Sequence, residues 1–144
     1  MPDKYDALKL EHQLCFPLYA ASHAVIKRYR PHLEALDLTY TQYIALMVIW
    51  QEKRIHVKAL GERLFLDSGT LTPVLKSLEA KGYITRARSK EDERVLMAEI
   101  TPSGEALRDQ ALSVPESMAD CLPLSPQESV TLYTLLYKIL AAQA

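Results

Sequence analysis

Two cysteines, Cys15 and Cys121, carry the most reactive side chains of this 144-residue chain. Proline disfavours helical backbone in the residue before it, so the helix that contains Pro17 is expected to begin between Leu14 and Pro17. Cys15 would then lie at a helix N-terminus, where unpaired backbone N–H groups and the positive end of the helix dipole stabilise a thiolate. A lone cysteine on an apolar helix is more often a small buried hydrophobe, so the residue types alone leave both roles open.

The rest of the composition argues against a metal enzyme and a membrane protein. The sequence has no CxxC, no HExxH and no phosphate-binding glycine loop, and its four histidines do not fall at metal-ligand spacing with the cysteines. We therefore predict no cofactor, no metal and no catalytic residue. The first residues are charged and no apolar run approaches the ~18 residues that span a bilayer, so a cytoplasmic protein without a membrane partner is expected. In such a chain, two distant cysteines indicate buried or redox-active thiols better than a structural disulfide.

A winged helix-turn-helix is predicted around residues 39–101. Apolar positions 57, 60 and 64 indicate a short helix, and residues 67–70 combine turn formers with three possible N-cap side chains. A recognition helix is predicted over residues 68–81, since the helical period restarts at Leu71 and Lys81-Gly82 can end it. Residues 83–86 and 95–100 are read as two strands of a hairpin wing.

The charge distribution favours DNA as the partner of this unit. From Lys53 to Arg94 there are ten Lys and Arg against six Asp and Glu, a net charge of +4, while the rest of the chain carries −5. Arg94 is the best candidate for insertion into a minor groove, with Asp92 as its ion-pair partner. The full set of predicted DNA contacts is Ser68, Gly69, Thr70, Thr72 and Lys76 in the recognition helix and Arg86, Arg88, Ser89, Lys90, Asp92 and Arg94 in the wing.

The two ends of the chain are expected to form a homodimer. Apolar positions step by three and four up to Tyr29, and Pro31 is expected to stop that helix. Another helix should run from Thr101-Pro102 to Val114, with Pro115 as its kink or end. The last helix begins at a capping box, residues 125–128, and carries more apolar surface than a small domain can cover. Residues 1–144 are thus predicted to be one mainly α-helical domain with a small β-hairpin, dimerised through segments 8–36 and 102–144.

Several segments together resemble the organic hydroperoxide resistance regulators of the MarR family of winged-helix repressors. The resemblance covers nearly the whole chain. The segments that carry it are Gln13-Leu14-Cys15-Phe16 with Tyr19, Leu38-Thr39-Tyr40-Thr41-Gln42-Tyr43, Leu66-Asp67-Ser68-Gly69-Thr70-Leu71-Thr72-Pro73, and the wing from Arg86-Ala87-Arg88-Ser89 to Asp92-Glu93-Arg94.

The resemblance implies a role for each thiol. Cys15 matches the peroxide-reactive sensor, and Tyr29 and Tyr40 (with Tyr19 in some members) match tyrosines that hydrogen-bond it, one of them from the partner subunit. Cys121 matches the cysteine of two-cysteine members that resolves the sulfenic acid as an intersubunit disulfide, although its neighbours form no strong motif. The implied protein is a repressor that binds a double-stranded, pseudo-palindromic operator and is induced by organic hydroperoxide, in an oxidative stress response.

Two other functions remain open at this point. The first is a MarR-type repressor released by a small phenolic or drug-like effector without redox chemistry. The second is a thiol peroxidase that turns over hydroperoxide at Cys15, although such an enzyme has no use for a wing and a recognition helix. For the redox switch, the reduced thiols are expected to lie farther apart than the ~7 Å between Cα atoms that a disulfide tolerates, so that closing the gap moves the Cys121 loop and the recognition helices.

Overall fold

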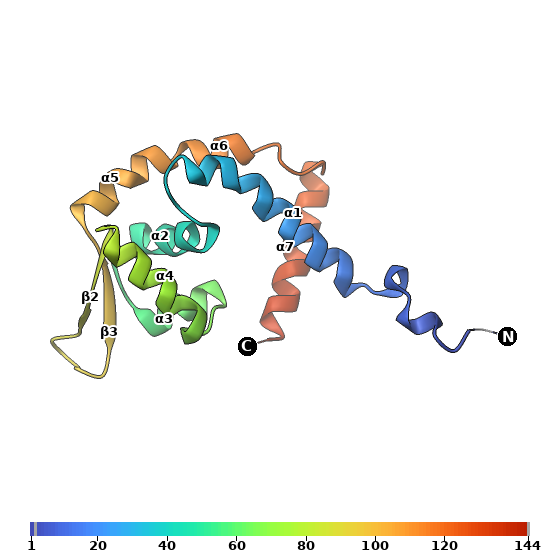
Figure 1. Ribbon diagram of the computed structural model, residues 1–144, viewed down its shortest axis with the longest axis horizontal. Helices are drawn as coiled ribbons and strands as arrows, with labels where there is room; N and C mark the ends of the chain where they lie inside the picture. The colour runs from blue at the N-terminus through green and yellow to red at the C-terminus, as the bar shows by residue number, and fades with distance from the viewer. Residues whose placement is uncertain (2, 144) are drawn as a thin grey trace.

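The computed structural model describes Met1 and residues 3–143, and it is mainly helical with one small sheet (Figure 1). In chain order the elements are two short 3₁₀ helices, η1 (Asp6–Leu8) and η2 (Leu10–His12), then α1 (Cys15–Glu34), α2 (Tyr40–Glu52), β1 (Arg54–His56), α3 (Val57–Leu64), α4 (Ser68–Ala80), β2 (Ile84–Arg88), β3 (Leu96–Ile100), α5 (Pro102–Ala111), α6 (Ser113–Met118) and α7 (Pro126–Ala141). The mainly α fold with a small β wing is confirmed.

The core lies between α2, α3 and α4, which form the helix-turn-helix and its support. Leu46, Ile49, Leu60, Leu75 and Leu78 are fully buried there, and α2 is apolar on nearly all sides because it packs inside this unit. Removing such large side chains from water is the main source of the unit's stability.

The sheet has the strand order β1-β3-β2 and is antiparallel throughout. Ile84 pairs with Ile100 and Arg88 with Leu96, while Arg54 pairs with Glu99 on the other side of β3. The hairpin wing was predicted, but β1 was not. Its three residues are too few to establish a period of two, and only its contacts with β3 define it as a strand.

Helix starts agree well with the capping signals of the sequence. In the capping box of α2, the Thr39 hydroxyl accepts from the Gln42 N–H at 3.2 Å and the Gln42 side chain accepts from the Thr39 N–H at 3.0 Å. Ser125 and Glu128 form the same arrangement at the start of α7. These boxes satisfy N–H groups that have no partner within the helix.

Of two predictions about prolines, the stop at Pro31 was wrong, whereas the break expected from Pro115 is present but begins earlier in the chain. Pro31 does not stop α1, which continues to Glu34 because Leu33 is buried in the core and holds the last turn in place. The helix toward Val114 breaks earlier than expected, at Ala111. Pro115 has no N–H to continue the ladder of α5, so the chain starts a new helix, α6, in which Pro115 lies in the first turn, where no donor is needed.

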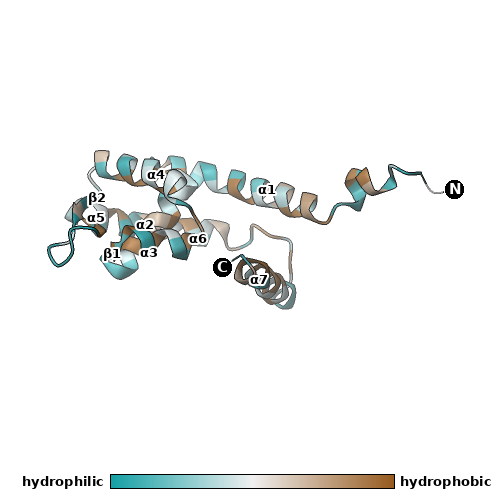
Figure 2. Ribbon diagram, turned by 90° about the horizontal axis from the view of Figure 1, so that it is seen from below, coloured by the Kyte–Doolittle hydropathy of each residue, from teal (hydrophilic) through white to brown (hydrophobic). Residues whose placement is uncertain are grey.

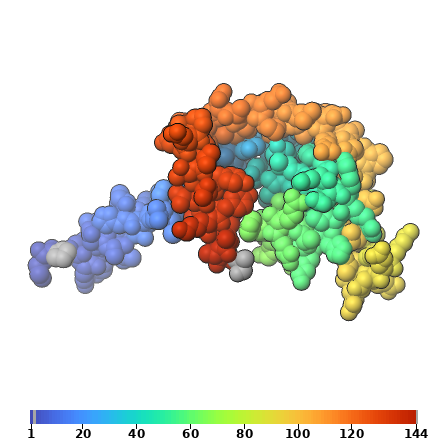
Figure 3. All heavy atoms as spheres, turned by 180° about the vertical axis from the view of Figure 1, so that it is seen from behind, coloured from blue at the N-terminus to red at the C-terminus, as the bar shows by residue number. Residues whose placement is uncertain are grey.

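The two ends of the chain leave large apolar faces uncovered. The N-terminal part of α1 and the residues before it extend away from the body (Figures 1 and 3). Helix α7 has no buried residue, and Figure 2, which views this helix nearly end-on, shows it mostly in the brown of hydrophobic residues. Tyr133, Leu135 and Ile139 each expose about half of their surface or more. Of the helices in the described residues, none is long and apolar enough to cross a membrane.

Candidate functional site

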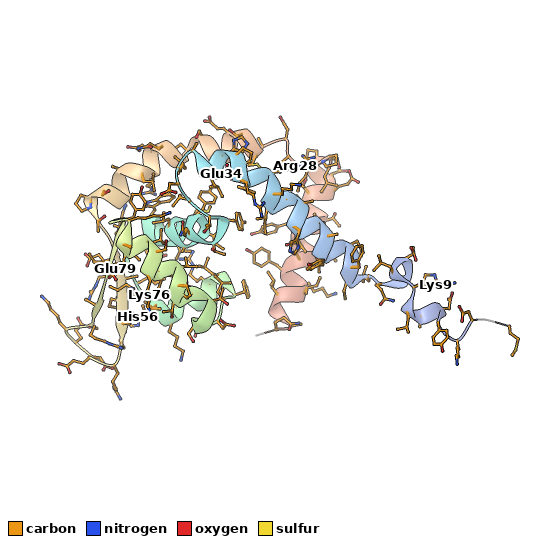
Figure 4. The ribbon with its side chains drawn as sticks, in the orientation of Figure 1. Lys9, Arg28, Glu34, His56, Lys76 and Glu79 are labelled. Atoms are coloured by element: carbon orange, nitrogen blue, oxygen red, sulfur yellow. The ribbon has the colours of Figure 1, made fainter. Side chains whose placement is uncertain are left out.

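The N-terminal turn of α4 presents small polar groups to solvent. Asp67 caps the helix by accepting from the Thr70 N–H at 2.7 Å, and this backbone hydrogen bond holds the pKa of the Asp67 carboxyl below its usual value. The predicted contact residues of this helix follow the cap: Ser68, Gly69, Thr70 and Lys76 are exposed and Thr72 is half-buried. Figure 4 shows Lys76 on α4, below the end that joins the wing.

The tip of the wing carries a fixed guanidinium. Arg94 Nε donates to Asp92 Oδ1 at 3.0 Å and Arg94 Nη2 donates to Asp92 Oδ2 at 3.1 Å, so the pair is bidentate. These hydrogen bonds lower the pKa of Asp92 and raise the pKa of Arg94. The Arg94 side chain remains 90% exposed, so the pairing orients the cation without covering it. Arg88 and Lys90 are exposed beside it.

Two residues of the predicted contact set face the protein instead. Arg86 Nη2 donates to Glu79 Oε1 at 3.1 Å, the Arg86 backbone N–H donates to Glu79 Oε2 at 3.0 Å, and only 18% of the Arg86 side chain is exposed. Ser89 is buried, and its hydroxyl accepts from the Glu91 N–H at 3.2 Å. Arg86 therefore joins the wing to α4, and Ser89 shapes the tip. Nothing in the sequence indicated that Glu79 is the partner of Arg86.

Cys15 is the first residue of α1 and is exposed, which confirms its predicted position at a helix N-terminus. Tyr19 lies one turn farther along the same helix and is 62% exposed. Its ring packs against that of His23, with 4.2 Å between ring centroids. Of the three predicted tyrosines, Tyr19 is thus the one that lies within about one helical turn of Cys15 in the same chain.

Tyr29 and Tyr40 lie at the other end of α1, in a cluster with Tyr43. The ring centroids are 5.0 Å apart for Tyr29 and Tyr40 and 6.1 Å apart for Tyr29 and Tyr43. Burial raises the pKa of all three phenols, and the neighbouring tyrosines and Cys121 raise that of Tyr29 further. Neutral phenols are the hydrogen-bond donors that a thiolate requires. In the sequence, Tyr43 was singled out only as part of the segment from Leu38 to Tyr43 that carries the family resemblance.

Cys121 lies near Tyr29 of this tyrosine cluster, in the segment between α6 and α7. Its carbonyl oxygen accepts a hydrogen bond from Arg28 Nη1, and its N–H donates to the Met118 carbonyl at 3.1 Å. Arg28 and Cys15 are thirteen helical residues apart, roughly 20 Å along the helix axis. Because disulfide-bonded cysteines have Cα atoms within ~7 Å, Cys15 and Cys121 of one chain cannot form a disulfide in this arrangement.

No metal site accompanies these groups among the described residues, since no three His, Cys, Asp or Glu side chains gather there. The molecule thus combines a helix-turn-helix and wing that present an oriented cation with two separate thiol environments. The helix-turn-helix of α3 and α4, followed by the β2–β3 wing, defines the class of winged-helix DNA-binding proteins.

Comparisons with known proteins agree with this class. The family described as "Transcriptional regulator SarA/Rot" matches residues 27–110. The organic hydroperoxide resistance transcriptional regulator of Bacillus subtilis (strain 168) is 44% identical over 140 residues, which cover 97% of this chain and 95% of the relative.

Solved structures of two other proteins are also similar. Reduced AbfR bound to DNA has a TM-score of 0.77 at 33% identity, over 98% of both chains, and AbfR in its disulfide form has a TM-score of 0.65 at 34% identity, over 95% of this chain and 96% of that one; AbfR comes from Staphylococcus epidermidis. A MarR variant from E. coli, complexed with operator DNA, has a TM-score of 0.73 at 26% identity, over 96% of this chain and 99% of the other. The chain belongs to the MarR family of winged-helix transcriptional regulators, in the branch of the organic hydroperoxide resistance regulators.

Proposed function

We propose that this regulator is a redox-sensing repressor that binds a pseudo-palindromic operator as a two-fold homodimer while Cys15 is reduced, and releases it when an organic hydroperoxide oxidises Cys15. One observation carries the proposal. Cys15 lies at one end of α1, and Tyr29, Tyr40 and Cys121 gather near the other end. A two-fold axis across α1, midway between positions 15 and 29, would place Cys15 of one subunit beside Tyr29 of the other.

The uncovered faces of the terminal helices support such a dimer. Helix α7 and the first turns of α1 expose more apolar surface than a monomer in water normally does. Ala21 and Ser22 lie exposed at the middle of α1, and small side chains there allow two helices to cross closely. In this arrangement both Tyr29 and Tyr40 would reach Cys15 from the partner, whereas the family resemblance had assigned one of them to the partner.

The chemistry uses both thiols. The Cys15 thiolate attacks one peroxide oxygen, the O–O bond breaks, and the alkoxide leaves as an alcohol after taking a proton, so that Cys15 becomes a sulfenic acid. The Cys121 thiolate of the partner subunit then attacks the Cys15 sulfur, the S–O bond breaks, and hydroxide leaves as water after taking a proton. The hydroperoxide gains two electrons, which the two thiols supply. Loss of the thiolate also weakens the hydrogen bonds from Tyr29 and Tyr40.

Operator binding would use the recognition helix and the wing. The exposed start of α4 suits a major groove, and the oriented Arg94 guanidinium suits a flanking minor groove. Two such units about one helical turn of DNA apart, ~34–36 Å, would match a pseudo-palindrome. The chain resembles DNA-bound AbfR, whether reduced or overoxidized (TM-score 0.77 for each), more closely than disulfide AbfR (TM-score 0.65). This supports the assignment of the present conformation to the DNA-binding state.

The test compares operator binding before and after one equivalent of organic hydroperoxide, in the wild type and in Cys15→Ser. Fluorescence anisotropy with a labelled operator should show release by the oxidised wild type. Cys15→Ser should bind like the reduced wild type and ignore the hydroperoxide. Release by hydroperoxide in Cys15→Ser would show that Cys15 is not the sensor.

A further inference from the structure

The backbone of Cys121 is held at both of its polar groups. Its N–H donates to the Met118 carbonyl at 3.1 Å, and its carbonyl oxygen accepts from Arg28 Nη1 although the two residues are 93 positions apart. Figure 4 shows Arg28 on α1, where the segment that follows α6 passes the helix. Among the described residues, the Arg28 hydrogen bond is the only one that joins residues 119–125 to α1.

We propose that Arg28 is a positioning residue for the resolving step, in which it holds Cys121 beside Tyr29 so that the partner's oxidised Cys15 meets the second thiol. This inference rests on the proposed function. Arg28 is adjacent to Tyr29 in α1, and Cys121 lies close enough to Tyr29 to contribute to its raised pKa. If Tyr29 contacts Cys15 across the dimer, a hydrogen bond from Arg28 keeps Cys121 within the same neighbourhood.

A positioned thiol reacts faster than one on a free loop, because the entropy of bringing the sulfurs together is lost in advance. Arginine suits this role, since its guanidinium stays charged at every physiological pH and its planar donors have a fixed direction. One hydrogen bond from a charged donor at a partly exposed site corresponds to a rate effect on the order of 10-fold.

Speed matters because a sulfenic acid has competing fates. The partner's Cys121 converts it to a disulfide, a second hydroperoxide converts it to an irreversible sulfinic acid, and a small thiol converts it to a mixed disulfide. Arg28 would therefore also lower the fraction of Cys15 that is oxidised to sulfinic acid when hydroperoxide is in excess.

The experiment compares Arg28→Gln with Arg30→Gln. Arg30 is an exposed arginine of the same helix, and no hydrogen bond or ion pair of its side chain is found among the described residues. After rapid mixing with cumene hydroperoxide, mass spectrometry follows loss of the Cys15 thiol, and non-reducing electrophoresis follows the covalent dimer. Arg28→Gln should consume the Cys15 thiol at the wild-type rate, form the covalent dimer about 10-fold more slowly, and accumulate more sulfinic acid. Arg30→Gln should match the wild type in all three measurements.

A covalent dimer that forms in Arg28→Gln at the wild-type rate or faster would overturn the inference. A wild type that never consumes the Cys15 thiol would instead overturn the proposed function, so the two failures are distinguishable. Reduced Arg28→Gln should keep the wild-type Tm and operator affinity. Should it lose either, Arg28→Met, which keeps an unbranched aliphatic stem but has no donor, takes its place: slower dimer formation with unchanged thiol consumption supports the inference, and a wild-type rate overturns it.

Discussion

At the scale of single residues, the wing has one arginine that is buried against the protein and one that is exposed to solvent. Arg86 and Arg94 are both arginines of the basic segment, and each has a carboxylate partner at hydrogen-bonding distance. Arg86 is nevertheless mostly buried against Glu79, whereas Arg94 is 90% exposed. Only the exposed member of this pair can release counterions from DNA by contacting phosphates directly.

Arg94→Ala is therefore expected to weaken operator binding on the order of 10-fold and to reduce the slope of log K against log salt by about one. The measurement is operator affinity at several salt concentrations. Arg108→Ala is the matched control, because Arg108 lies on α5 and pairs with Glu105. Unchanged affinity and slope in Arg94→Ala would remove this residue from the DNA interface.

At the scale of elements, the start of α4 depends on one ionised carboxylate. Asp67 accepts from the Thr70 N–H, and this hydrogen bond lowers the pKa of Asp67 in the folded state. A carboxyl with a lowered folded pKa releases its proton more readily in the folded than in the unfolded protein. Its contribution to stability is thus fully present above the unfolded pKa and is lost as pH falls through the folded pKa.

Asp67→Asn should remove this pH dependence while keeping a cap, because an asparagine oxygen accepts the same hydrogen bond and does not titrate. Tm measured from about pH 5 down to about pH 3 should fall less steeply in Asp67→Asn than in the wild type. Asp109→Asn on the exposed face of α5 serves as control, and should follow the wild type. Parallel curves for Asp67→Asn and the wild type would show that the cap does not act through its charge.

Elements with local signals could be predicted from the sequence, and those fixed by distant contacts could not. The capping boxes at Thr39 and Ser125 depend on residues three positions apart, and both are present in the structure. Pro31 was misread because the burial of Leu33, which extends α1, depends on the tertiary core. The pairing of Arg86 with Glu79 was missed for a similar reason, since it requires the wing to lie against α4.

The candidate site shows the same division between sequence and structure. The types and spacing of residues located Cys15 at a helix N-terminus and grouped the wing cations. They could not show that Tyr29, Tyr40 and Cys121 gather at the opposite end of α1, because that grouping depends on how α1, α2 and the segment after α6 pack together.

At the scale of the whole molecule, the chain has two thiol environments, one at Cys15 and one at Cys121, that do not meet within a subunit. Roughly 20 Å of helix separates Cys15 from the position of Arg28 and Cys121. The same chain exposes apolar faces at both ends, on α1 and α7. A two-fold dimer would cover these faces and bring the two thiol environments together, as the proposed function requires. We therefore expect the disulfide to form between subunits.

The most direct test uses a heterodimer of Cys15→Ser and Cys121→Ser subunits, prepared with two different tags. This heterodimer holds one Cys15 and one Cys121, and the two lie in different subunits. After treatment with one equivalent of organic hydroperoxide, non-reducing electrophoresis should show a covalent dimer for the heterodimer and for the wild type, but for neither mutant homodimer. A heterodimer that stays monomeric on the gel while the wild type forms a covalent dimer, or a covalent dimer in either mutant homodimer, would contradict a disulfide between Cys15 of one subunit and Cys121 of the other.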